Sequence, residues 1–235
     1  KVEIQRAING IKIAIEQIGL QEGHEIAMGH TASSANRIAY TMKEPIGVVA
    51  AISAFNHAFN LAVQQVISAI AVGCPVIIRP ATQTPMSAIK LVEILKEAGL
   101  PNGWAQAVVC DRNAGELLVT SPKTAFFTFI GSGPVGWYLN SKSSPGTRSA
   151  LEHGGVAPVI VEPDADIEAM IPDLVKGGFY HAGQVCVSVQ RIFVHESIAN
   201  TVASKIAEKA SKLVVGNQLD PKTEVGPLIN HNEVN

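Results

Sequence analysis

The chain has 235 residues, of which 47% are hydrophobic and 16% are charged, and its formal net charge is -2. This composition supports a packed core in one or two domains, and the lack of a basic run excludes a typical nucleic-acid-binding surface. Because no apolar stretch is long enough to cross a bilayer and no secretory signal opens the sequence, we expect no membrane association.

Apolar periodicity and turn residues predict an alternation of helices and strands along the chain. Isoleucines spaced three and four residues apart predict a helix at the start of the sequence. Thr84 and Pro85 are expected to cap and open a later helix. Further helices are expected at 59–72, after the glycine-rich turn at 131–136, and at 198–213. Buried strands are expected at 46–52, 75–79, 105–109, 125–129, 158–161 and 189–194.

This alternation is typical of βαβ units, and it predicts an α/β fold with a parallel sheet. Such sheets bind ligands at the carboxyl ends of their strands. Residues 27–45 differ, because their polar and small residues end in an alternating run that predicts an exposed hairpin able to pair with another subunit. Both termini lack a closing element, so we expect the chain to be part of a longer protein.

A glycine-rich turn, Gly131-Ser132-Gly133-Pro134-Val135-Gly136, fits the G-x-G-x-x-G pattern between a predicted strand and a predicted helix. Backbone N–H groups at such a turn can face a pyrophosphate. Glu152 lies about twenty residues further on, where the dinucleotide fingerprint has its ribose-binding acid. The same glycines also suit a tight turn with no ligand, so the match alone does not decide between the two.

Other candidate residues are equally ambiguous when each is taken alone. Cys186 could be a nucleophile or a small hydrophobic residue. Glu152, beside Gly154 and Gly155, could be a base or a loop charge, and Asn56 could be a turn former. The three cysteines of the chain form neither a disulfide framework nor a zinc motif, so we expect no metal and a reducing, cytoplasmic location.

Taken together and in order, these motifs resemble the aldehyde dehydrogenase superfamily over residues 44–229. The matching stretches are EPIGVV (44–49), FN (55–56), VIIRP (76–80), EAGLPNG (97–103), FIGS (129–132), LEHGG (151–155), DAD (164–166), GQVC (183–186) and VGPLI (225–229). The resemblance implies a Rossmann-like NAD(P)-binding domain over 1–152. It also implies the start of an α/β catalytic domain over 153–235, whose remainder is expected downstream.

The resemblance implies that Cys186 attacks an aldehyde carbonyl as a thiolate. The Asn56 side chain and the Cys186 backbone N–H would then hold the oxyanion. Glu152 would activate the water that hydrolyses the thioester, so its role as a ribose ligand is rejected. The products would be a carboxylic acid and reduced cofactor, made by an enzyme of the family's usual homo-oligomeric form, a dimer or tetramer.

The same resemblance assigns cofactor binding to Ser53, Arg79, Thr82, Gly131 and Ser132, with NAD or NADP as cofactor. Arg79 replaces the family's usual lysine, and Thr82 replaces a glutamate common in NAD-preferring members. Removing that carboxylate would remove repulsion from a 2′-phosphate, so we expect NADP to be accepted.

Three further departures from the family's pattern bear on the site. Ile130 replaces a threonine before Gly131, and His153 replaces a leucine after the glutamate. His57 replaces a bulky aromatic residue that often lines the substrate tunnel, which favours a small, polar aldehyde as substrate.

Three alternatives stay open at this point. A CoA-acylating semialdehyde dehydrogenase is disfavoured by the presence of Glu152, since acylating members often lack this base. A cysteine hydrolase pairing Cys186 with His181 or His153 leaves the other motifs unexplained. A non-catalytic protein on an enzyme fold is disfavoured by the intact set of Asn56, Glu152 and Cys186.

Overall fold

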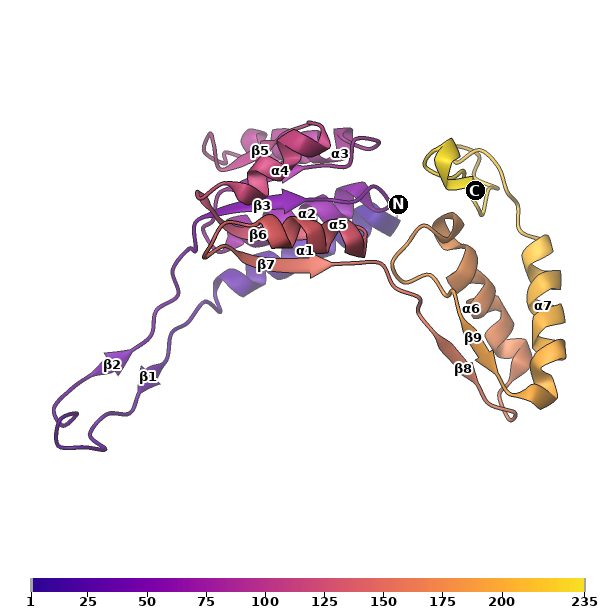
Figure 1. Cartoon of the computed structure of the whole chain (residues 1–235), viewed down its shortest axis with the longest axis horizontal. Coiled ribbons are helices and arrows are strands. Elements are labelled where there is room, and N and C mark those ends of the chain that lie inside the picture. Colours follow the sequence, from indigo (N-terminus) through magenta and orange to yellow (C-terminus); the bar gives the residue numbers. More distant parts are fainter. Residues whose placement is uncertain (1, 235) are drawn as a thin grey trace. The chain divides into compact units, whose positions relative to one another are not determined.

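The computed structural model describes residues 2–234, which form two compact units that divide between Glu152 and His153. We call them the sheet unit and the second unit, and Figure 1 colours them in sequence order.

The sheet unit is built on five parallel strands in the order β5-β4-β3-β6-β7. Along the chain they are β3 (Val48–Ile52), β4 (Val76–Arg79), β5 (Ala105–Ala107), β6 (Thr124–Ile130) and β7 (Arg148–Glu152). The chain builds outward from β3 to β5 and then returns to place β6 on the other side of β3. This arrangement confirms the predicted parallel α/β fold, and it puts a topological switch point between β3 and β6.

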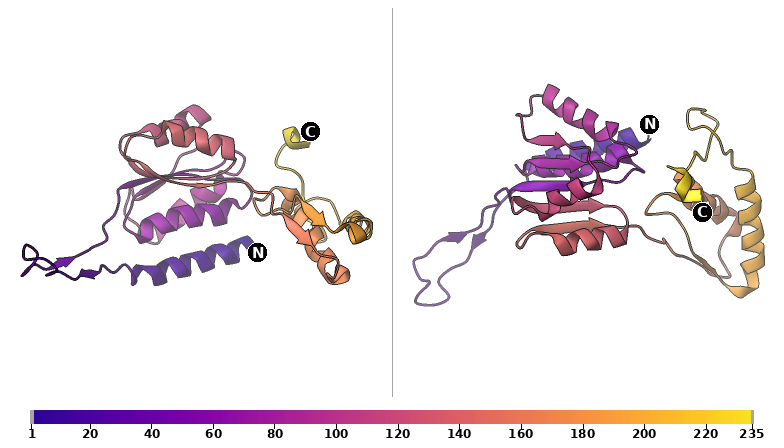
Figure 2. Two further views of the ribbon diagram at one scale, coloured as in Figure 1. Left: turned by 60° about the horizontal axis from the view of Figure 1, so that its bottom comes forward. Right: turned by 45° about the horizontal axis from the view of Figure 1, so that its top comes forward.

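Helices cover both faces of this sheet, so the sheet unit has layers of helix, strand and helix (Figure 2). Helices α2 and α3 lie on one face with α1 packed outside α2, and helices α4 and α5 lie on the other. Their bounds are α1 (Val2–Ile18), α2 (Ala58–Ala71), α3 (Met86–Glu97), α4 (Arg112–Thr120) and α5 (Gly133–Lys142).

The two helical layers bury two apolar clusters against the sheet. On the α2 side, Val63 and Val66 project from one face of the helix onto Ile78 and its neighbours. On the α4 side, Phe127 and Val119 are fully buried. Because both faces of the central strands are covered, those strands show the continuous apolar runs from which they were predicted.

Several details of the sheet unit differ from the sequence-based expectations. The prediction that Thr84 caps α3 is wrong. Pro85 takes the N-cap position, and no side chain makes a capping bond to this helix. Helix α4 and strand β7 were not predicted at all. Strand β7 lies at the sheet edge and is mostly exposed, so it has no apolar run to reveal it.

The segment between α1 and β3 forms an arm that extends away from the sheet (Figure 1). Strands β1 (Glu25–Ile26) and β2 (Ala39–Tyr40) pair antiparallel within it. An exposed hairpin is thus present, but its first strand precedes the expected range of 27–45. Apolar side chains are exposed along the arm, and Ile38 is 89% exposed.

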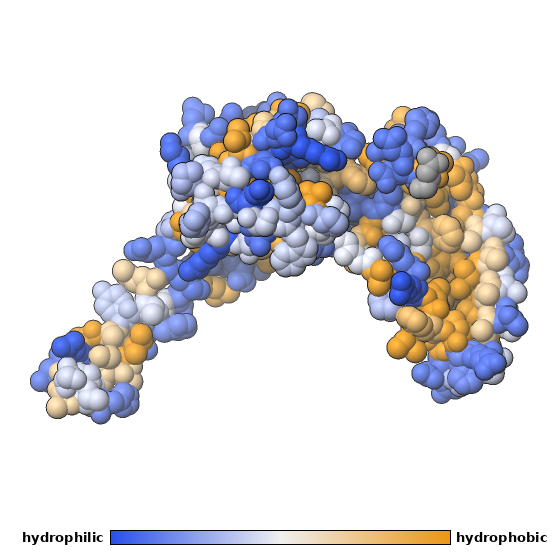
Figure 3. Space-filling view, in the orientation of Figure 1, coloured by the Kyte–Doolittle hydropathy of each residue, from blue (hydrophilic) through white to orange (hydrophobic). Residues whose placement is uncertain are grey.

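The second unit holds a two-stranded parallel sheet of β8 and β9 beside the helices α6 and α7. Its elements are β8 (Val159–Val161), α6 (Ile167–Phe179), η1 (Tyr180–Gly183), β9 (Ile192–Val194), η2 (Glu196–Ile198), α7 (Ala199–Ser211) and η3 (His231–Val234). Ile171, Val175 and Val202 form its core. Apolar surface is visible over this unit in Figure 3, and Ile160 on β8 is 74% exposed.

No described helix of either unit is both long enough and apolar enough to span a bilayer.

Candidate active site

The carboxyl ends of four strands meet at one edge of the sheet. Ile52 of β3 is in register with Arg79 of β4 and with Phe129 of β6, and Ile130 is in register with Glu152 of β7. Hydrogen bonds continue the sheet one residue further, since the N–H of Ser53 donates to the Arg79 carbonyl at 3.0 Å. The residues that follow β3 and β6 therefore emerge side by side at the switch point.

Buried polar atoms at this edge have no hydrogen-bond partner within residues 2–234. They include the hydroxyl of Ser53, a residue only 6% exposed, the Nε of Arg79, and the hydroxyl of Thr84 in the loop after β4. The Arg79 guanidinium does make one contact, because its Nη2 donates to the carbonyl of Cys110 at 3.2 Å. Unpaired buried polar groups are costly, so their presence at a sheet edge points to a ligand that would pair with them.

The turn after β6 is close-packed and opens a helix. A Cβ placed on Gly131 would lie 2.6 Å from the Phe129 ring, so no larger residue fits here. Ser132 is the N-cap of α5 but makes no side-chain capping bond, and Pro134 stands in the first turn. The first N–H groups of this ten-residue helix thus remain available for an anion, which the helix dipole also favours.

Asn56 lies in the loop between β3 and α2 and is half-buried. Its Oδ1 accepts a hydrogen bond from the N–H of His57 at 3.0 Å. Because this bond uses the acceptor end of the amide, it fixes which side of Asn56 carries the NH₂ donor.

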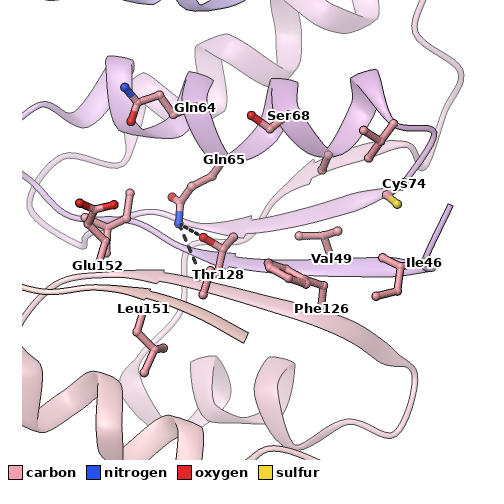
Figure 4. Close-up of a pocket in the computed structure, with 14 residues that line it drawn as sticks. Ile46, Val49, Gln64, Gln65, Ser68, Cys74, Phe126, Thr128, Leu151 and Glu152 are labelled. Carbon is pink, nitrogen blue, oxygen red and sulfur yellow. Dashed lines mark hydrogen bonds between the residues drawn. The ribbon is translucent and has the colours of Figure 1, made fainter. Parts of the chain in front are cut away.

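Glu152 ends β7 and lines a cavity of about 400 Å³ between α2 and the sheet. Figure 4 shows Glu152 at one end of this cavity and Cys74 at the other. Gln64, Gln65 and Ser68 reach into it from α2. Most of its other lining is apolar, including Ile46, Val49 and Phe126, so its polar groups are concentrated near Glu152 and α2.

Cys186 is exposed on a loop of the second unit, directly after η1. Three consecutive residues of η1 have positive φ, namely His181 at 57°, Ala182 at 55° and Gly183 at 75°. The loop is then held by two backbone bonds, in which Val189 N–H donates to the Gly177 carbonyl and Gln190 N–H donates to the Val156 carbonyl, both at 3.0 Å. A left-handed turn followed by an anchored loop therefore presents the thiol at the surface of its unit.

The structure brings together most of the residues proposed from sequence on the sheet unit, where Ser53, Asn56, Arg79, Gly131, Ser132 and Glu152 all follow or end its strands. Thr82 is exposed in the loop after β4. Cys186 belongs to the second unit.

Three residues near these positions were not predicted. The buried amide of Gln65 donates to the Ile52 carbonyl at 3.2 Å and to the Thr128 hydroxyl at 3.2 Å, which ties β3 to β6. The Cys110 carbonyl accepts a hydrogen bond from Arg79, and Gly115 of α4 lies close to the Arg79 side chain. No local sequence pattern signals such contacts between distant residues.

A doubly wound parallel sheet with a glycine turn and unpaired polar atoms at its switch point defines an α/β unit of the nucleotide-cofactor-binding class. The comparison with known families is consistent with this class, since the aldehyde dehydrogenase family matches residues 1–235. The chain belongs to the aldehyde dehydrogenase family.

Among its relatives is 3-sulfolactaldehyde dehydrogenase of Priestia aryabhattai, 41% identical over 229 residues, which make up 97% of this chain and 48% of the relative. Another is lactaldehyde dehydrogenase of Methanococcus vannielii, 40% identical over 206 residues, with 86% of this chain and 44% of the relative covered. A similar solved structure is glyceraldehyde-3-phosphate dehydrogenase of Methanocaldococcus jannaschii in complex with NADP. It matches with a TM-score of 0.89 and 37% identity over 97% of this chain and 50% of that one. The chain thus spans about half the length of the curated relatives it matches.

Proposed function

We propose that this chain supplies the cofactor-binding domain (residues 1–152) and the nucleophile-bearing start of the catalytic domain (153–235) of an enzyme that oxidises an aldehyde to a carboxylic acid with NAD(P)⁺. The observation that carries the proposal is the switch-point edge. There, buried polar atoms lack a partner within residues 2–234, among them the Ser53 hydroxyl after β3, the strand next to β6 and its glycine turn, and the Arg79 Nε at the end of β4 on the other side of β3.

The residues at this edge suit a dinucleotide. Ser53 and Arg79 offer donors for a ribose or its phosphate. The turn at Gly131 and Ser132 opens helix α5, whose first N–H groups can face the pyrophosphate. Because residue 82 is threonine, it adds no carboxylate to the loop after Arg79. The 2′-phosphate of NADP would therefore meet the Arg79 cation without repulsion from a carboxylate at this position. We therefore propose that NADP is accepted as well as NAD, which a comparison of kcat/KM for the two cofactors tests. A strong preference for NAD would contradict it.

In the proposed reaction, the Cys186 thiolate forms a bond from Sγ to the aldehyde carbonyl carbon. The carbonyl oxygen becomes an oxyanion, which the Asn56 amide and the Cys186 N–H stabilise by hydrogen bonds. Bound NAD(P)⁺ supplies the hydride acceptor. Glu152 then removes a proton from the water that attacks the resulting Cys186 thioester, which releases the acid and restores the thiol.

A small, polar aldehyde is the proposed substrate class. The relatives named above act on sulfolactaldehyde and lactaldehyde, both polar aldehydes with few carbons. In this chain His57 stands in place of a bulky aromatic residue, and amide side chains share the cavity with Glu152. His57→Phe is expected to shift kcat/KM from polar toward aliphatic aldehydes, and an unchanged ratio would contradict this assignment.

The test of the proposed function is aldehyde-dependent reduction of NAD(P)⁺ by the full-length protein, with and without CoA. Cys186→Ala is expected to abolish it, while Cys74→Ala, which alters a buried cysteine at the opposite edge of the sheet, retains it. Glu152→Gln is expected to slow turnover about 100-fold or more and to leave a burst of cofactor reduction. Activity that survives Cys186→Ala would overturn the mechanism, and activity that requires CoA would indicate an acylating enzyme.

A further inference from the structure

Arg79 lies in a slot that exists because residue 115 has no side chain. A Cβ on Gly115 of α4 would lie 2.7 Å from the Cδ and 2.8 Å from the Nε of Arg79, closer than packed atoms approach. Gly115 is itself buried, and its N–H donates to the Asp111 carbonyl at 3.0 Å as part of a regular helical turn. Its backbone does not require glycine, since its φ is not positive. Glycine at position 115 therefore makes room for the Arg79 side chain, although it lowers the stability of helix α4.

Within this slot, only part of the Arg79 guanidinium is hydrogen-bonded to the described residues. Nη2 donates to the Cys110 carbonyl at 3.2 Å, and the buried Nε has no partner within residues 2–234. The α4 backbone at Gly115 limits how far the side chain can move in that direction. Arg79 is thus a cation with a fixed position at the carboxyl end of β4.

We propose that Gly115 is a specificity-determining position, which sets where the Arg79 charge meets the adenosine end of the cofactor and thereby favours a dinucleotide with a 2′-phosphate. This inference rests on the proposed function. A guanidinium that is already held in place loses little freedom when it pairs with a phosphate, and its planar donors match phosphate oxygens. A ribose 2′-hydroxyl carries no charge and gains much less from the same arrangement.

The experiment is isothermal titration of the full-length protein, wild type and Gly115→Ala, with NADP and with NAD. The new methyl group displaces Arg79 from the slot, and only the end of a flexible side chain has to move. We expect the Kd for NADP to rise about 10-fold or more, the loss of roughly one hydrogen bond to a charged group, and the Kd for NAD to change less than about twofold. The melting temperature should not fall, because alanine favours helix over glycine.

The Arg79→Lys background is the matched control. Lysine keeps the charge but lacks the planar group that fills the slot, so Gly115→Ala should change the Kd for NADP less than twofold in this background. Equal weakening of NADP and NAD, no change of either, or the same effect in both backgrounds would overturn the inference while leaving the proposed function intact. A wild-type protein that binds neither dinucleotide would overturn both.

Discussion

The carboxylate of Glu3 in α1 caps the start of α2 at Phe59, a residue 56 positions further along the chain. Its Oε1 accepts hydrogen bonds from the N–H of Phe59 at 2.8 Å and from that of Asn60 at 3.1 Å. Helix α2 has no capping side chain of its own, since His57 occupies the N-cap position without such a bond. Because α2 begins two residues after Asn56, the capping bond from α1 also helps to fix the loop that carries this proposed oxyanion donor.

Glu3→Ala should therefore destabilise the protein by about 1 kcal/mol, the usual effect of removing a helix cap together with a charge that favours the helix dipole. Glu3→Gln keeps an acceptor but loses the charge, and about half of that effect is expected. Urea unfolding measures both. The control is Glu16→Ala, at an exposed position of the same helix. Equal stability of the Glu3 and Glu16 variants would show that the cap contributes nothing.

Gln65 joins the two strands that flank the switch point, and its side chain is 6% exposed. Gln65→Leu keeps the approximate size but leaves the Ile52 carbonyl and the Thr128 hydroxyl without this donor. We expect a loss of about 1 to 3 kcal/mol in the free energy of unfolding. The exposed neighbour Gln64 provides the control, since Gln64→Leu should change stability by less than about 0.5 kcal/mol. Similar values for the two variants would remove Gln65 as a link between the strands.

Burial on both faces accounts for only part of the strand prediction, since β8 and β9 were also predicted although Ile160 of β8 is 74% exposed. Strand β3 and strand β6 carry apolar runs because helices cover them on both sides, whereas β7 is exposed and its residues give no such signal. Helix α4 was also missed; it is short, with nine residues, and it includes Gly115, which lowers helix propensity and which the structure explains through Arg79.

The candidate site was predicted to a similar, partial extent. Asn56 and Gly131 were proposed from short motifs after predicted strands, because in a parallel sheet such positions converge on one edge. Glu152 was proposed from the family resemblance, since β7 itself was not predicted. The contacts of Glu3 and Gln65 could not be predicted, because each joins residues that only the fold brings together and neither follows a spacing typical of a motif.

Ala182 has a φ of 55°. In this left-handed conformation a residue with a Cβ has a higher free energy than glycine. Ala182→Gly should raise the free energy of unfolding by about 0.5 to 1 kcal/mol, measured by urea unfolding. The same substitution at Ala203, exposed in the right-handed helix α7, should lower it by about 1 kcal/mol. If both variants lost stability, the turn before Cys186 would not be strained.

The arm formed around β1 and β2 is the part of the chain that we expect to join subunits. Each of its short strands has one edge without a strand partner in the described chain, and Ile38 beside β2 is 89% exposed. An exposed strand edge with apolar side chains favours pairing with a second copy. Ile38→Asp in the full-length protein should therefore lower the molar mass measured by light scattering after gel filtration. Leu219→Asp, a change at an 85% exposed leucine of the second unit, should leave the mass unchanged. An oligomer that survives Ile38→Asp, and also survives Ala39→Pro in the β2 ladder, would show that subunits join through another surface.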